Sequence, residues 1–176
     1  MTEHELQHYG VKGMKWGHRK ADRRVEKSLY RAGRHQGRAD YYKSKGAAAA
    51  QKHETNAKVF DKTAKRFESE GKYFRAEASR KAAAALRARG ANAKAAQDAI
   101  AKKYEAKATK ITEKANKYAT KKRVDLGKKR IDEIMNKSKQ DGYNRAKDMD
   151  NYNRESALRS RLGDGGYNVL NKVRGR

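Results

Sequence analysis

The sequence contains no cysteine and no proline among its 176 residues. Without cysteine, the chain cannot form a disulfide framework or a cysteine-based zinc ribbon. Without proline, every position in a helix can supply its backbone N–H donor. Ala, Lys, Arg, Glu and Gln are abundant, and these residues favour helices. We therefore expect an all-α fold built from long helices.

Large apolar residues are also scarce. Leu, Ile, Val and Phe together number 20 of 176 residues, which is about 11%. That share lies well below the roughly 20% at which a highly charged chain is expected to lack a packed core. Ala makes up 28 of the 63 residues counted as hydrophobic, and an alanine buries little area. The sequence therefore predicts extended helices without a large globular core.

Long apolar runs are absent as well. No stretch is long and apolar enough to cross a bilayer. The first residues are acidic and glycine-containing, unlike the basic and apolar start of a secretory signal. We expect a protein that contacts no membrane and works in a cytoplasm or in a particle assembled there.

Positive charge is plentiful, with 46 Lys and Arg against 21 Asp and Glu, a formal net charge of +25. The excess is spread along the whole chain, which suits sequence-independent contact with phosphate backbones. It can equally serve a negatively charged protein partner. The densest cluster that we assign to non-specific nucleic-acid contact consists of Lys121, Lys122, Arg123, Lys128, Lys129 and Arg130.

Glycine positions and composition divide the chain into four segments. We expect a flexible, glycine-punctuated recognition peptide at 1–19, a basic helix at 20–45, a helical hairpin at 46–141 and a flexible, basic Asn- and Gly-rich tail at 142–176.

Two stripes of large residues repeat every seven positions, as in coiled coils. Their phases match if the chain turns at Arg89–Gly90, between helices at about 47–89 and 91–141. The alternatives are a single rod through Gly90 or no stable order. With little area to bury, we expect the hairpin to self-associate or to gain order from a partner. In the predicted pairing, Phe60 lies opposite Tyr118, Phe67 opposite Ile111, and Phe74 opposite Tyr104.

The stretch HELQH at 4–8 matches the zinc-protease spacing, with His4 and His8 as ligands and Glu5 as general base. A working site also needs a third ligand, supporting contacts and a dry cleft. The extended pattern requires Gly and His at positions that hold Val11 and Met14. We predict no metal, no cofactor and no catalytic residues, and keep a zinc hydrolase as a minor alternative.

Residues 8–19, HYGVKGMKWGHR, form a more specific string. It resembles a short motif, H-[HY]-G-[VI]-K-G-x-K-W-G-x-R, found near the ends of structural and head-morphogenesis proteins of tailed bacteriophages and prophages. The resemblance covers about a dozen residues and implies a phage context, not an activity. The residues that we assign to partner docking are His8, Tyr9, Gly10, Val11, Lys12, Gly13, Lys15, Trp16, Gly17 and Arg19.

Trp16 has the side chain most typical of interface hot spots, although it could instead cover the start of the first helix. With the resemblance, this implies a virion structural or head-morphogenesis protein that docks to capsid or portal-region proteins. A histone-like nucleic-acid-binding protein and a scaffolding protein are the alternatives. We expect the five tyrosines off the stripes to fill an interface rather than to stack on bases; they are Tyr41, Tyr42, Tyr143, Tyr152 and Tyr167.

Overall fold

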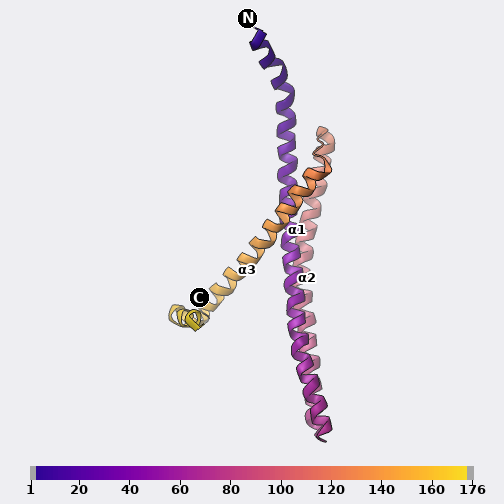
Figure 1. Ribbon diagram of the computed structural model, residues 1–176, viewed down its shortest axis with the longest axis vertical. Helices are drawn as coiled ribbons and strands as arrows, with labels where there is room; N and C mark the ends of the chain where they lie inside the picture. Colours follow the sequence, from indigo (N-terminus) through magenta and orange to yellow (C-terminus); the bar gives the residue numbers. More distant parts are fainter. Residues whose placement is uncertain (1–2, 174–176) are drawn as a thin grey trace.

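The computed structural model describes the backbone of residues 3–173 and the side chains of residues 19–173 except 164, 170 and 172. The described chain forms three long helices and no strand: α1 (Glu3–Ser69), α2 (Tyr73–Lys122) and α3 (Lys128–Val173). Helices α1 and α2 make an antiparallel hairpin, and α3 crosses α1 obliquely before it diverges (Figure 1). The prediction of an all-α fold with extended helices and a hairpin is confirmed.

The hairpin turns at Gly71. Gly71 has φ 72° and ends α1 with two capping bonds, from its own N–H to the Glu68 carbonyl at 3.0 Å and from the Lys72 N–H to the Phe67 carbonyl at 2.8 Å. This is the Schellman pattern, which places glycine at the left-handed position. The predicted turn at Arg89–Gly90 is therefore wrong, and Gly90 lies inside α2.

The predicted pairing of large residues is wrong for the same reason. Tyr104 stacks on Tyr42 and His35 of α1 instead of meeting Phe74. Phe74 is 85% exposed and Phe60 is 40% exposed. Because the chain turns at Gly71, each residue of α2 lies opposite an α1 residue about five heptads nearer the N-terminus than predicted. The same faces still meet, because a shift by whole heptads preserves a seven-residue repeat.

Small residues make the contact between α1 and α2. Ala57 and Ala64 of α1 and Ala83 of α2 are almost fully buried. A β-carbon added at Gly46 would lie 3.0 Å from the Gln97 β-carbon, so the two backbones approach closely there. The inward face of α2 does repeat every seven residues, at Ala76, Ala83, Gly90, Gln97, Tyr104, Ile111 and Tyr118, all buried or half-buried.

Glycines also bring α1 and α3 into contact. A β-carbon at Gly33 would overlap the Ser138 hydroxyl, and one at Gly37 would overlap the Lys139 carbonyl. From the other side, a β-carbon at Gly142 would overlap the Arg34 carbonyl. Each helix thus presents two small residues four positions apart, a spacing that lets helix backbones touch.

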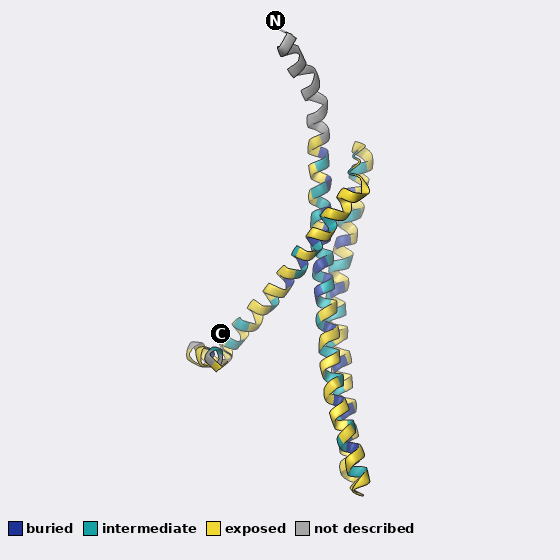
Figure 2. Ribbon diagram, viewed as in Figure 1, coloured by how far each residue is buried: buried dark blue, intermediate teal, exposed yellow. Residues whose placement is uncertain are grey.

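Larger apolar side chains gather in one place, where the three helices meet. Val25 and Leu29 of α1 pack with Ala115 of α2, beside half-buried Tyr118 and Ile134. Elsewhere the buried positions form a narrow line between the helices, and the outer faces are exposed (Figure 2). The described part of the chain has no large globular core, as predicted.

The helices run through the predicted segment boundaries. The backbone of α1 is helical from Glu3, across glycines 10, 13 and 17 and across residues 19 and 45. A glycine costs a helix only about 1 kcal/mol relative to alanine, and extending an existing helix is far easier than starting one. Helix α3 covers residues 142–173, with a non-helical break at Gly163 (φ 66°, ψ 168°).

Candidate nucleic-acid interface

The basic cluster predicted at 121–130 lies around the loop that joins α2 to α3. All six of its Lys and Arg residues are exposed. Arg130 forms ion pairs with Glu26 at 3.1 Å and Glu133 at 3.7 Å, which ties α3 to α1. No ion pair to the described residues is formed by the other five. No described carboxylate therefore pairs with these five side chains, whereas Arg130 has a structural role.

Arg123 also shapes this loop. Its backbone is left-handed (φ 52°), its N–H bonds to the Thr120 carbonyl at 3.2 Å, and the Val124 N–H bonds to the Ala119 carbonyl at 2.9 Å. These bonds end α2 in the pattern seen at Gly71. A left-handed residue with a β-carbon costs roughly 1–2 kcal/mol, so the backbone of Arg123 serves the turn while its exposed side chain faces solvent.

The predicted docking peptide lies mostly outside the described side chains. The structure gives the helical backbone of its residues, but their side chains are not described until Arg19, which is exposed. The first buried residue of α1 in the described part is Ala21. Packing of α1 against the other helices is therefore seen from Ala21 onward.

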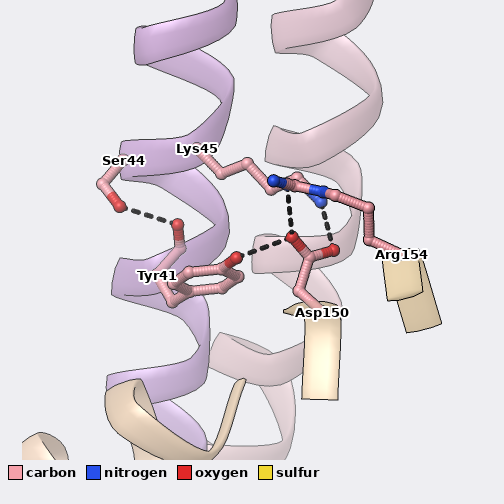
Figure 3. Close-up of polar contacts among 5 residues, drawn as sticks. All are labelled: Tyr41, Ser44, Lys45, Asp150 and Arg154. Atoms are coloured by element: carbon pink, nitrogen blue, oxygen red, sulfur yellow. Dashed lines mark hydrogen bonds and ion pairs between the residues drawn. The ribbon is translucent and has the colours of Figure 1, made fainter. Parts of the chain in front are cut away.

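Two pairs of tyrosine and aspartate hold α3 across α1. Tyr41 donates a hydrogen bond to Asp150 at 2.8 Å, and Lys45 and Arg154 form ion pairs with the same carboxylate (Figure 3). Nine residues earlier in α3, Asp141 accepts a hydrogen bond from Tyr30 at 3.1 Å. Asp141 also lies 3.2 Å from the Arg34 Nε, in an ion pair whose alignment does not make a hydrogen bond.

These contacts shift the ionisation of their members. Burial, together with the hydrogen bond to Asp150, raises the pKa of Tyr41 to about 12. Burial would raise the pKa of Asp150, but hydrogen bonds from Lys45 and Tyr41 outweigh it and the pKa is lowered. Both shifts favour the neutral phenol and the charged carboxylate, the states in which the two groups bond across the crossing.

A group of aromatic side chains joins α1 to α2, and it includes Tyr42, the chain neighbour of Tyr41. The Tyr104 ring stacks on Tyr42 at 5.7 Å and on His35 at 5.9 Å, measured between ring centroids. The guanidinium of Arg38 and the ammonium of Lys107 lie 5.7 Å and 5.6 Å from the Tyr104 ring centre. Such cation–π contacts draw positive charge toward the rings.

The tyrosines off the two heptad stripes have different surroundings. Tyr41 and Tyr167 are buried, Tyr42 and Tyr143 are half-buried, and Tyr152 is 68% exposed. Tyr41 contacts Tyr42 and Tyr143 edge-on, at 5.4 Å in each case. Four of the five thus pack within the chain, and Tyr152 alone presents most of its ring to solvent.

Sequence reasoning missed one row of basic residues. Arg31, Arg34, His35 and Arg38 lie on one face of α1 and line a cavity of about 150 Å³. The His35 Nδ1 is buried and finds no hydrogen-bond partner among the described residues. Burial and the charges of Arg38, Lys107 and Arg34 lower the pKa of His35. The spacing of these residues was visible in the sequence as one helical face.

The described part of the chain offers neither a set of metal ligands nor a membrane-spanning helix. No group of three His, Cys, Asp or Glu side chains in this part of the chain could hold a metal ion. The HELQH side chains at 4–8 fall outside it. In residues 3–173, no helix combines the length and the apolar character that crossing a bilayer requires.

Comparison with known proteins yields one match. A model described as a family of unknown function (DUF7211) matches residues 1–23. No curated protein and no solved structure matches the chain. The match covers the segment that contains the motif at 8–19 and leaves the helical body outside it.

Proposed function

We propose that this protein is a bacteriophage virion structural or head-morphogenesis protein. It docks to capsid or portal-region proteins through residues 8–19 and contacts packaged DNA non-specifically through its basic helices. The observation that carries the proposal is the motif HYGVKGMKWGHR, which resembles a phage structural motif. The family match to residues 1–23 supports treating this N-terminal segment as a unit with its own role.

The helical body supports contact with DNA. The formal charge of the whole chain is +25, and most of it is distributed over long helices with exposed outer faces (Figure 2). Four exposed lysines around the α2–α3 loop form no ion pairs to the described residues; they are Lys121, Lys122, Lys128 and Lys129. Charge presented in this way neutralises phosphates without reading bases, so binding releases counterions and weakens steeply as salt rises.

In the proposed docking, Trp16 has the main role. An indole anchor buried by a partner typically supplies 2 kcal/mol or more of an interface's binding energy. Lys12, Lys15 and Arg19 would add charge-assisted bonds. Since the body contains few large apolar residues, Trp16 has little core of its own to join.

The test is the incorporation of Trp16→Ala protein into particles of the phage or prophage that encodes this gene. We expect incorporation to fall at least tenfold, with DNA affinity and its salt dependence unchanged. The matched control is Tyr73→Ala, which removes a ring that is 72% exposed on the helical body. It should be incorporated normally. Normal incorporation of Trp16→Ala would refute the docking role and favour a histone-like protein of the cell.

A further inference from the structure

Two adjoining cavities at the helix crossing share Arg38. The smaller, of about 150 Å³, is lined by Arg31, Arg34, His35 and Arg38 of α1. The larger, of about 460 Å³, is lined by residues of all three helices, with Arg38 at its α1 wall. Its volume falls within the range of about 300–1,000 Å³ that is typical of small-molecule sites.

The two cavities differ in chemistry. Every residue lining the smaller one is an arginine or a histidine. The larger one has three tyrosines in its walls, Tyr42, Tyr104 and Tyr152, together with Arg145, Asp148 and Met149. An oxyanion therefore fits the first cavity, and a flat aromatic group fits the second.

Among the described residues, no carboxylate lines the smaller cavity to balance the charge. Arg34 is paired with Asp141, but the pair is shared with Arg145 and Tyr30. His35 faces Arg31, Arg34 and Arg38 on its own helix and Lys107 and Tyr104 on α2. Its buried Nδ1 is left without a partner in the described chain. A bound phosphate would supply the negative charge that this group of cations lacks.

The larger cavity offers an accessible ring. Tyr152 is 68% exposed, and Met149 beside it is 60% exposed. Tyr42 and Tyr104, which also line this cavity, are already stacked in parallel, with 3° between their planes. A planar base entering this cavity would meet aromatic faces and the edge of Arg38, the combination that single-stranded nucleic-acid sites use. Asp148 would accept hydrogen bonds from base N–H groups, and its charge directs the phosphate toward the arginines.

We propose that the two cavities together form a site for one nucleotide with an unpaired base, whose phosphate lies among Arg31, Arg34 and Arg38 and whose base lies against Tyr152. The ligand class is single-stranded nucleic acid or a free nucleotide. This site rests on the nucleic-acid contact proposed above and adds to it a preference for strands with accessible bases.

The test compares two fluorescein-labelled strands of about 12 nucleotides, one of thymidines and one abasic, by fluorescence anisotropy at a fixed salt concentration. Both strands carry the same phosphates, so a difference in affinity reports the bases alone. We expect the thymidine strand to bind about fivefold tighter or more, because stacking of one base typically contributes that much. Equal affinities would overturn the site while leaving general DNA contact intact, and no binding of either strand would overturn both.

Substitutions in the two cavities test whether the preference for the thymidine strand arises there. Tyr152→Ala should abolish the preference for the thymidine strand and leave abasic binding unchanged, whereas Tyr152→Phe should keep the preference. Arg38→Ala should weaken both strands more than Arg75→Ala, which removes an exposed arginine on the hairpin away from the crossing. If Tyr152→Ala retains the full preference, the base does not lie in this cavity and the proposal fails.

Thymidine monophosphate as a competitor distinguishes the two sources of the nucleotide. Displacement of the labelled strand at millimolar concentration would assign the site to a free nucleotide as well as to a strand. No displacement would assign it to the strand alone. Equal displacement by a polyglutamate peptide of matched charge would contradict the site, because it would show that negative charge without a base is sufficient.

Discussion

At the scale of single residues, glycine is the residue that decides the architecture. Gly71 provides a left-handed turn (φ 72°) that reverses the chain, and Gly163 breaks α3. Gly33, Gly37 and Gly142 act differently, since their backbones are helical and they are needed because another backbone lies against them. Some of these glycines thus end or break a helix and others admit a neighbouring backbone, and only their neighbours in space tell which.

Gly37→Ala should detach α3 from α1. The added β-carbon would overlap the Lys139 carbonyl, which is backbone and cannot swing away. Overpacking of this kind costs about 1–3 kcal/mol, against a gain of up to about 1 kcal/mol in helix propensity. Hydrogen exchange should show faster exchange of α3 amides around residues 138–150.

Gly165→Ala is the matched control for this substitution. No described atom lies within 4 Å of the β-carbon it would add, so it should leave exchange at the crossing unchanged and stabilise α3 by up to about 1 kcal/mol. If Gly37→Ala slows exchange in α3, the close contact described here is wrong.

Tyr41 should give the molecule a dependence on alkaline pH. Its pKa in the folded chain is about 12, above the ordinary value of 10.0. The unfolded chain therefore loses this proton first, and stability contributed by Tyr41 is complete below pH 10 and lost as pH rises toward 12. Ultraviolet titration of the wild type minus that of Tyr41→Phe should show a single phenol that titrates near 12. A difference titrating near 10, in the folded protein, would contradict the Tyr41–Asp150 bond.

At the scale of helices, a seam of small residues holds the hairpin together. Ala83 is fully buried, whereas its neighbour Ala84 is exposed. The seam consists of Ala57, Ala64 and Ala83, and the close approach of the backbones leaves no room for larger side chains at these positions. The same closeness lets Gly90 pack against Ala50 and His53 of α1.

Ala83→Leu should destabilise the hairpin by about 1–3 kcal/mol, because it forces α1 and α2 apart. Ala84→Leu, which adds the same atoms on the exposed face, should change stability by no more than about 0.5 kcal/mol. Guanidinium denaturation followed by circular dichroism measures both. Equal effects of the two substitutions would mean that the seam does not lie where α2 meets α1 here.

Sequence alone could predict the helices and half of the pairing. The stripe of Tyr104, Ile111 and Tyr118 does face α1, but its partners are His35, Tyr42 and their neighbours rather than the three phenylalanines. A heptad repeat fixes the face of a helix and leaves its register open at every seventh residue. The turn decides the register, and the sequence offers a turn at either Gly71 or Gly90. Of these two glycines, only Gly71 has a left-handed backbone.

The candidate nucleotide site was harder to predict. The row of Arg31, Arg34 and Arg38 can be read from helical spacing, and Tyr104 was singled out for pairing. The arginines and Tyr104 come close to Tyr152 because α3 crosses α1 at Gly33 and Gly37. In the sequence those two glycines indicate a weakened helix, because nothing local distinguishes a glycine that weakens a helix from one that admits a neighbour.

At the scale of the whole molecule, the protein is an extended, strongly basic body. Helix α1 runs the length of the molecule, and α3 leaves it at an angle (Figure 1). Such a shape buries little apolar area. In the function proposed above, its basic residues would reach many phosphates at once, and the N-terminal peptide would supply the tryptophan anchor that attaches it to a particle.

We propose that the protein belongs to a virion and is held there by its N-terminal peptide. The first experiment to make is mass spectrometry of purified, nuclease-treated particles from the phage or induced prophage that encodes this gene. We expect the protein to be present in reproducible amounts, with peptides covering residues 1–19 intact. Particles that lack the protein, while lysates of the same cells contain it, would contradict the claim.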